Sequence, residues 1–474
     1  MLKLLPRLRL PVLCALAAAA VLGAGVRLAI PGTALQHGPA ALGLFDVAVW
    51  PALALALLIR LCEDGPRGVL KSLGSAPLAG YLLLALALWS GLVWPRLAGA
   101  EPPALTAAAR DLVQLAEYGL AAFIACAELG AEERARRWAA AVLAGALGLI
   151  VLVGAVQYFR AGPDFGVGSL LGNRNALGAF LAVAAPFCAA MALGLPGGCC
   201  AWRPVWTVLA AALALLALTG GAVLGLVCGA LAAAACLGRR KLLAAAGALL
   251  VLLAVGQALP RHNLSAAVES VRLERKNPRV GEAPAPGAPA EPETLLAMRY
   301  VRLGYELNML RASLTDRKLL FGLGPGGYGR EKRFRPKLAE RPAGQTDNPE
   351  NYDVLADEPN TFDFFLGAGV RMGVLGVLGF LWLFAWWAGR ALAAWRTGRG
   401  ELDRAVAAGA FGAVLGAAAA GLFSSPWIQG AGPLLVMLVA LARPVRESPA
   451  DQTEMENGAG LTSPPGPAIM NMPH

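Results

Sequence analysis

The sequence predicts an all-α membrane protein that crosses the bilayer about twelve times and carries one large loop outside the membrane. Two compositional observations and one pattern predict this class. Hydrophobic residues make up 57% of the 474 residues, and charged residues only 15%. A soluble domain carries about 25% charged residues, so the polar surface that would keep this chain in water is missing. Leu, Ala, Val and Gly also fill successive runs of roughly 20 residues, the length that an α-helix needs to cross about 30 Å of hydrocarbon.

These apolar runs give the order of the predicted membrane helices. We expect the helices near residues 10–30, 41–60, 76–95, 104–127, 138–158, 175–195, 204–219, 220–237, 241–259, 364–388, 405–423 and 427–443. The first run is too long for the core of a signal peptide, so we interpret it as an uncleaved helix. The runs 204–219 and 220–237 meet at Thr219-Gly220-Gly221 and could instead form one long tilted helix.

The chain therefore divides into four parts. Residues 1–259 contain predicted membrane helices 1–9, and residues 260–363 form the large loop between helices 9 and 10. Residues 364–443 contain helices 10–12. Residues 444–474 include many Pro, Ser, Glu and Asn, which predicts a disordered tail.

Basic residues orient the predicted helices in the membrane. When the N-terminus is placed in the cytoplasm, nineteen Lys and Arg fall in cytoplasmic segments and four in or beside the short outer loops. Cytoplasmic loops of membrane proteins carry an excess of Lys and Arg, so we expect cytoplasmic N- and C-termini and an extracytoplasmic loop 260–363. The net charge of +10 then reflects orientation, and nucleic acid is not an expected partner.

Cysteine usage gives no sign of a metal site or of disulfides. All eight cysteines lie outside residues 260–363, and the one adjacent pair, Cys199-Cys200, lacks the spacing of metal ligands. We therefore expect no metal and no cofactor, and interpret the cysteines as small apolar residues or reduced thiols.

Three features inside the predicted helices carry further expectations. Glu117 lies deep in a helix, and an ionisable group at the bilayer centre costs about 2.5–3.5 kcal/mol, so this residue points to a polar cavity. Gly221, Gly225 and Gly229 recur every four residues, which fits close helix packing or, less simply, a transport path. Trp386-Trp387 is interpreted as part of an interfacial aromatic belt.

The large loop contains a glycine-rich stretch, Gly322-Leu323-Gly324-Pro325-Gly326-Gly327-Tyr328-Gly329-Arg330. Glycines allow positive φ and close backbone approach, and exposed N–H groups in such a stretch can hold an anion. Gly322, Gly324 and Gly326 therefore predict either a tight turn or an anion cradle. The preceding residues 294–318 have apolar residues at spacings of three and four, which predicts an amphipathic helix near the membrane surface.

Charge in the loop is segregated. Residues 299–341 contain eleven Lys and Arg against four acids, whereas residues 342–363 contain six acids and neither Lys nor Arg. A basic stretch followed by an acidic one suits a site that holds a phosphorylated group and removes a proton beside it. The pattern also fits mutual neutralisation of the two stretches, or contact of the basic stretch with anionic membrane lipids.

Two segments resemble the O-antigen ligase/O-antigen polymerase family of membrane proteins. Residues 171–175, Leu-Gly-Asn-Arg-Asn, lead into a predicted helix and are similar to the family's Gly-Asn-x-Asn motif. Arg302, Tyr305 and Asp316, followed by the glycine-rich stretch, resemble the Arg…Trp…Asp…Gly-x-Gly-Pro-Gly stretch of the family's periplasmic loop. The expected number of helices and the position of the large loop fit the same family.

The resemblance implies a glycosyltransferase of the bacterial inner membrane that uses no metal. It would move a glycan from a polyprenyl diphosphate to a hydroxyl of a lipid or glycolipid acceptor at the periplasmic face. An arginine would hold the leaving diphosphate, because its planar guanidinium matches phosphate oxygens. The candidates for this role are Arg174, Arg299, Arg302, Arg311 and Arg330.

The sequence departs from the family's pattern at two places. The family's expected base is a loop His-Asn just before the next membrane helix, where this chain has Pro-Asn at residues 359–360. The family's Ser-Arg-Gly-Ala turn reads Thr-Gly-Gly-Ala at residues 219–222. Either a carboxylate, Asp357, Glu358 or Asp363, takes the role of the base, or the chain transfers nothing. Two alternative functions stay open: a membrane transporter, and a catalytically silent partner in the assembly of envelope polysaccharide.

Overall fold

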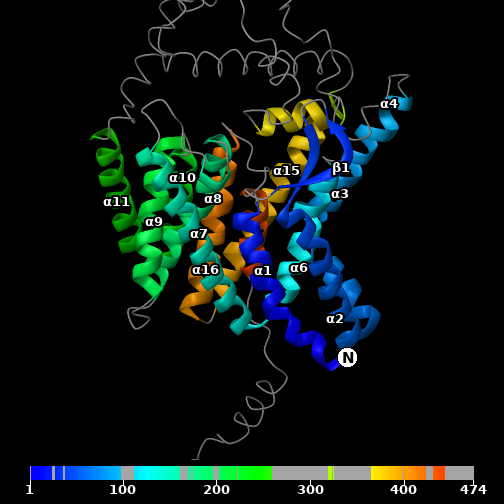
Figure 1. The fold of residues 1–474 in the computed structure, drawn as a ribbon, viewed down its shortest axis with the longest axis horizontal. Coiled ribbons are helices and arrows are strands. Elements are labelled where there is room, and N and C mark those ends of the chain that lie inside the picture. Colours follow the sequence, from blue (N-terminus) through cyan, green and yellow to red (C-terminus); the bar gives the residue numbers. More distant parts are fainter. Residues whose placement is uncertain are drawn as a thin grey trace, which may run out of the picture.

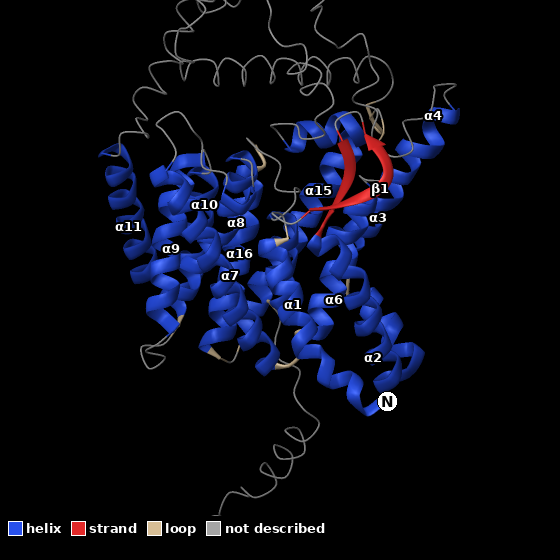
Figure 2. Ribbon diagram, viewed as in Figure 1, coloured by secondary structure: helices blue, strands red, loops and turns tan. Residues whose placement is uncertain are grey.

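The structure is a computed structural model, and it describes residues 2–23, 27–35, 38–97, 112–160, 169–171, 174–195, 202–220, 223–258, 319–322, 324, 364–398, 400–422 and 431–442. Residues 444–474, the predicted tail, and most of the large loop lie outside the described residues. Helices make up nearly all of the described chain and pack side by side in one bundle (Figures 1 and 2).

The helices follow one another in the order that the apolar runs predict. The chain starts with η1 (Leu2–Leu8) and α1 (Arg9–Leu22), and an antiparallel hairpin of β1 (Arg27–Leu35) and β2 (Gly38–Gly43) leads into α2 (Leu44–Gly74). Further along come α3 (Leu78–Leu88), the π-helical turn η2 (Trp89–Val93), α4 (Trp94–Leu97), the π-helical turn η3 (Glu117–Ala121), α6 (Ala122–Leu129), α7 (Glu133–Arg160), η4 (Ser169–Leu171), α8 (Arg174–Gly194), α9 (Trp202–Gly220), α10 (Val223–Leu237) and α11 (Arg239–Ala258). The last three helices are α15 (Phe364–Thr397), α16 (Glu401–Ala420) and α17 (Ala431–Leu441).

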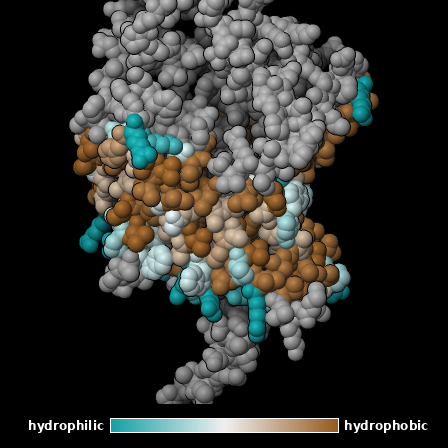
Figure 3. Space-filling model, viewed as in Figure 1, coloured by the Kyte–Doolittle hydropathy of each residue, from teal (hydrophilic) through white to brown (hydrophobic). Residues whose placement is uncertain are grey.

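Length and composition of the helices define the class of protein. Seven helices in the described part of the chain are long and apolar enough to cross a membrane. Four shorter apolar helices, Leu78–Val93, Trp202–Ala217, Val223–Leu237 and Ala431–Leu441, accompany them. Apolar residues cover the side of the bundle, and hydrophilic residues gather at its lower rim (Figure 3). The prediction of an α-helical membrane protein is confirmed, and the number of twelve crossings stays a prediction.

The first predicted helix is too long. The apolar run 10–30 predicts one helix, but α1 ends at Leu22 and the chain continues in strand β1. Gly23 and Gly25 disfavour a longer helix, and Pro31 falls at the irregularity of the hairpin between Ala29 and Ala34. An apolar run cannot by itself distinguish a strand from a helix. This hairpin is the one departure from an all-α fold among the described residues.

The runs 204–219 and 220–237 form two separate helices, α9 and α10. Arg203, at the start of α9, donates from Nε to the carbonyl oxygen of Ala192 near the end of α8 (3.2 Å). Gly194, at the end of α8, lies against Leu237 at the end of α10. The start of α9 and the end of α10 both lie beside the end of α8, so α9 and α10 run in opposite directions. One long helix over residues 204–237 is therefore excluded.

The helices start and end at two opposite faces of the bundle (Figure 1). At the face where α1 starts, the N-terminal face, Arg9 forms ion pairs with Glu63 of α2 and with Glu132 before α7 (2.6 and 3.4 Å). At the same face Arg136 of α7 forms an ion pair with Asp403 of α16 (3.1 Å). The hairpin joins the far end of α1 to the start of α2, and we call this opposite face the hairpin face (Figure 1).

A buried ion pair ties α2 to α6 near the N-terminal face. Arg60 donates from Nε to Oε2 of Glu128 at 2.6 Å, and these side chains are only 7% and 3% exposed. Arg60 also forms ion pairs with Glu63 and Asp64, each at 3.1 Å. A buried charge is tolerated only with such partners, so the pair fixes the ends of two helices against each other.

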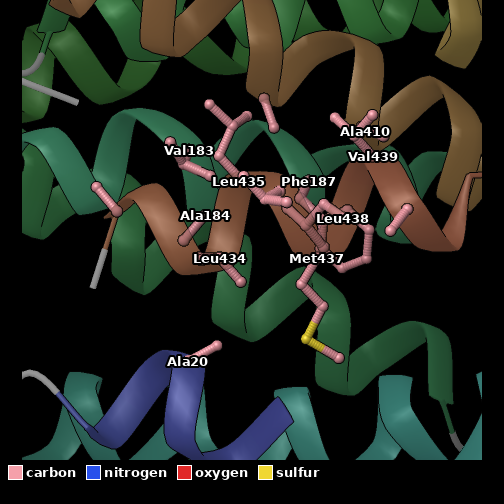
Figure 4. Packing of buried hydrophobic residues seen from close by; sticks show 14 of the residues in the cluster. Ala20, Val183, Ala184, Phe187, Ala410, Leu434, Leu435, Met437, Leu438 and Val439 are labelled. Atoms are coloured by element: carbon pink, nitrogen blue, oxygen red, sulfur yellow. The ribbon is translucent and has the colours of Figure 1, made fainter. Parts of the chain in front are cut away.

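Small residues allow the central helices to approach closely. Gly225 and Gly229 of α10 face Gly416 and Gly412 of α16, and a Cβ added at Gly229 would lie 2.6 Å from the carbonyl oxygen of Gly412. Every residue of α17 is buried, and its apolar side chains fill the centre next to those of α8 (Figure 4). Close helix packing therefore accounts for the spacing of Gly225 and Gly229, and Gly221 lies outside the described residues.

The interpretation of Trp386-Trp387 as belt residues is wrong for Trp387. Its side chain is fully buried, and its ring packs against that of Phe384, with 5.6 Å between ring centroids. Trp386 packs its ring against Phe123 of α6 at 5.4 Å. Trp386 thus joins α15 to α6, whereas Trp387 packs against its own helix inside the bundle.

Candidate functional site

Part of the large loop is bound to the membrane helix α15. The N–H of Gly324 donates to the carbonyl oxygen of Arg371, and the N–H of Val374 donates to that of Leu319, both at 2.8 Å. Between these two positions α15 is kinked at Gly373, whose φ is +67°. A kink leaves backbone groups of a helix without their usual partners. The loop segment supplies partners to α15 at this break.

Glycine is required at three positions of this contact. Gly322, Gly324 and Gly373 have φ values of +67°, +83° and +67°, a region that favours glycine. A Cβ at Gly322 would lie 2.6 Å from the backbone nitrogen of Gly373, and one at Gly324 would lie 2.4 Å from the carbonyl oxygen of Ser90. Gly322 and Gly324 therefore form a tight turn packed between helices, and the Gly324 N–H bonds to α15 instead of facing an anion. Gly326 lies outside the described residues.

An aromatic contact attaches the same segment to the end of α3. The ring centroid of Phe321 lies 6.1 Å from that of Trp89 and 5.6 Å from that of Trp94. Trp89 begins the π-helical turn η2, a geometry that is frequent at functional sites. The loop segment thus rests on two interrupted membrane helices, η2 on one side and the kink of α15 on the other.

The short helix η4, which precedes α8, is held against α7. Ser169, five residues before Arg174, is buried with a φ of +49°, and its hydroxyl donates to the carbonyl oxygen of Ile150 (2.7 Å). The Ser169 N–H donates to Oε1 of Gln157 (2.7 Å), whose side-chain nitrogen donates back to the Ser169 carbonyl oxygen (3.3 Å). Positive φ is uncommon outside glycine and persists only where the surroundings impose it. Gln157 and Ser169 therefore fix the chain just before the Leu-Gly-Asn-Arg-Asn segment.

Glu117 belongs to a hydrogen-bonded cluster between α2 and η3. Its side chain is buried, and its Oε1 accepts from Nε1 of Trp50 at 2.8 Å. Next to it, the hydroxyl of Tyr118 donates to Oδ1 of Asp46 (3.0 Å), and the N–H of Gly43 donates to Oδ2 of Asp46 (2.8 Å). Polar side chains surround Glu117 in the half of the bundle toward the hairpin face, and the polar cavity that the sequence predicts there stays a prediction.

Most of the predicted site residues lie outside the described residues: Asp357, Glu358 and Asp363 as bases, and Arg299, Arg302, Arg311 and Arg330 as diphosphate ligands. Arg174 is the first residue of α8. Sequence reasoning missed Phe321, Gly373, Gln157 and Ser169. Gly373 had a signal, because a glycine inside a helical pattern can mark a break. No local pattern marks Gln157 or Ser169, since they meet only in the folded chain.

Comparison with known proteins identifies no family for this chain. No protein-family model matches the chain, and no curated protein matches its sequence. The fold and the site define a class of protein: an α-helical membrane protein in which residues 319–322 and 324, which lie between α11 and α15 in the sequence, are bound to two interrupted helices.

Proposed function

We propose that the chain is a glycosyltransferase of the O-antigen ligase type. It moves a glycan from a polyprenyl diphosphate to a hydroxyl of a lipid or glycolipid acceptor. In this proposal the hairpin face is the periplasmic face of a bacterial inner membrane, and both termini are cytoplasmic. The observation that carries the proposal is the attachment of residues 319–324 to η2 and α15. The central motif of the large loop is thereby joined to the membrane bundle at the face where a lipid-linked donor would present its diphosphate.

The distribution of basic residues supports this orientation. Arg7, Arg67, Lys71 and Arg134 are exposed near the N-terminal face, where Arg9, Arg60 and Arg136 form ion pairs. Described basic residues toward the hairpin face are fewer: Arg27, Arg96, Arg160, Arg174 and Arg371. An excess of Lys and Arg on one side is typical of the cytoplasmic side.

The proposed reaction assigns two roles to the predicted residues. The acceptor oxygen attacks the anomeric carbon of the glycan, while the bond from that carbon to the diphosphate oxygen breaks. Asp357, Glu358 or Asp363 accepts the proton of the acceptor hydroxyl. Arginines stabilise the charge on the leaving diphosphate, namely Arg174 together with Arg299, Arg302, Arg311 or Arg330. In this proposal Gln157 and Ser169 hold the backbone before Arg174 in place.

The test measures the rate at which the purified protein transfers the glycan to the acceptor. The protein is placed in vesicles that contain a polyprenyl-diphosphate-linked glycan and a glycolipid acceptor. Arg174→Ala and Arg302→Ala should each lower the rate by about 10²-fold or more, the usual effect of losing a charge-stabilising donor. Arg160→Ala, an exposed arginine at the end of α7, should leave the rate unchanged. Full activity of both first variants would refute the diphosphate site. A silent assembly partner would show no transfer at all, while deletion of its gene still alters surface glycans.

Transport is the second candidate, and the Glu117 cluster is the observation that favours it. Ionisable groups inside a membrane often line the path of a substrate or proton, and Glu117 and Asp46 both lie buried within the bundle. A transporter would lose uptake or export in Glu117→Gln, which removes the charge but keeps an oxygen for Trp50. A transferase would retain glycan transfer in the same variant.

A further inference from the structure

Helix α2 consists of two parts that meet at Gly65, where φ is +67°. Residues 44–64 form the first part, roughly 31 Å long at 1.5 Å per residue, which matches about 30 Å of hydrocarbon. Residues 66–74 form the second part, which we call the surface helix. It begins where the first part has crossed the membrane, at the N-terminal face, and Pro66 suits its first turn.

The surface helix has a buried side and an exposed side. Gly68 and Ser72, four residues apart, are buried against the rest of the protein. Arg67, Leu70 and Lys71 are exposed, and Leu70 is 68% exposed, among the highest values for a large apolar side chain in the described chain. Residues spaced by three and four positions share one side of a helix. The exposed side therefore carries a leucine beside two cations.

The two cations have no acid opposite them. Glu63 and Asp64, just before the break, form ion pairs with arginines. The sequence of residues 66–74 contains neither Asp nor Glu. Within the described residues no ion pair involves Arg67 or Lys71. Their charge is thus available to a partner outside the protein.

The short helix η1 lies at the same N-terminal face. It packs against α2 and adds the exposed cation Arg7 beside Leu8, which is 44% exposed. Two elements from different parts of the sequence therefore present the same combination at the N-terminal face, an exposed leucine next to arginine or lysine.

We propose that Arg7, Leu8, Arg67, Leu70 and Lys71 form a binding surface for anionic phospholipids at the N-terminal face. The cations bind the phosphate and negative headgroup, while the leucines enter the apolar chains beneath. This combination fits the boundary of an anionic leaflet, because apolar side chains lose contact with water there and Lys and Arg meet opposite charge. The surface helix is too short to hold the membrane alone, so its function is to bind lipid around a protein that already spans the bilayer.

The experiment places an environment-sensitive fluorescent amino acid at position 70 of the full chain. The protein is reconstituted in nanodiscs of phosphatidylcholine, alone or with phosphatidylglycerol, together with a lipid that carries a quencher in its chains. We expect the emission to shift to the blue and quenching to increase as phosphatidylglycerol is added. In the R67Q/K71Q variant, the concentration of phosphatidylglycerol needed for half of this change should rise roughly thirtyfold, because two cations are lost, each contributes about 1 kcal/mol at an anionic surface, and about 1.4 kcal/mol corresponds to a factor of ten.

Two controls keep the result specific. The same probe at Leu250, which is also 68% exposed but lies in the middle of α11, should be quenched in both lipids without any effect of phosphatidylglycerol. R96Q/R160Q removes two exposed charges from the hairpin face and should leave the response at position 70 unchanged. A response at position 70 that ignores phosphatidylglycerol overturns the proposal. So does a response that persists in full in R67Q/K71Q, which would point to a protein partner or to apolar insertion alone.

Discussion

The N–H of Gly324, in the large loop, donates to the carbonyl oxygen of Arg371, two residues before the kink of α15 at Gly373. This contact joins a loop residue to the backbone of a membrane helix at the point where the helix is interrupted. It makes the break in α15 and the glycine-rich stretch parts of one structure. The stability of each should therefore depend on the other.

Gly373→Ala should destabilise the protein. A Cβ at this position would lie 2.3 Å from the carbonyl oxygen of Leu320, and φ of +67° is strained for alanine, which costs about 1–3 kcal/mol before the clash is counted. Gly389→Ala is the matched control in the same helix, because nothing lies within 4 Å of its added Cβ. This control should gain up to about 1 kcal/mol from helix propensity. Thermal unfolding in detergent, followed by tryptophan fluorescence, measures both, and equal shifts in the two variants would contradict the role of the kink.

Because α10 packs closely against α16, one methyl group added between them should lower the free energy of unfolding. In Gly229→Ala the Cβ would lie 2.6 Å from the carbonyl oxygen of Gly412 and 2.5 Å from Pro186, so the helices must separate. We expect a loss of about 1–3 kcal/mol, as for other overpacked interiors. Gly247→Ala in α11 has open space around the new Cβ and should be neutral or stabilising. Thermal unfolding in detergent measures both variants. A Gly229→Ala variant as stable as the unsubstituted protein would argue against tight contact at this glycine.

The buried ion pair of Arg60 and Glu128 predicts a large asymmetry between two arginine substitutions. Arg60→Met removes the cation that pairs with the buried carboxylate of Glu128 and should cost about 3–5 kcal/mol. Arg137→Met removes the exposed pair with Glu133 and should cost about 0–1 kcal/mol. Combining Arg60→Met with Glu128→Leu should recover part of the loss, because the buried negative charge that Arg60 neutralises is then removed as well. A double variant as unstable as Arg60→Met alone would show that the pair itself is not the cause.

The proposed orientation predicts the order in which two cysteines react with a membrane-impermeant maleimide. Gly326→Cys, in the large loop, should be labelled in spheroplasts with an intact inner membrane. Native Cys62, which is exposed at the N-terminal face, should be labelled only after that membrane is opened. Cys62→Ser is the control: the labelling that appears after the membrane is opened should be lost in this variant if it comes from Cys62. The reverse order would place the large loop in the cytoplasm, and the proposed function would then fail.

The sequence by itself determined the class of protein and the approximate position of most helices along the chain, whereas the structure decided that α9 and α10 are separate helices. Hydropathy over twenty residues is a local property, so it can be read without knowledge of the fold. It failed at residues 27–35, which form strand β1 of the hairpin, because an apolar run alone does not distinguish a strand from a helix.

Only the tertiary structure decided how the loop meets the bundle. Phe321 lies against Trp89 and Trp94, and Gly324 bonds to α15, although more than two hundred residues separate the two sides of the aromatic contact in the sequence. The same holds for Gln157 of α7 and Ser169 of η4, whose hydrogen bonds join two elements without any repeated sequence pattern. Hydrogen bonds and ring contacts of this kind depend on distances of a few ångströms between side chains from different elements. Those distances are set when the helices pack, and no local spacing in the chain encodes them.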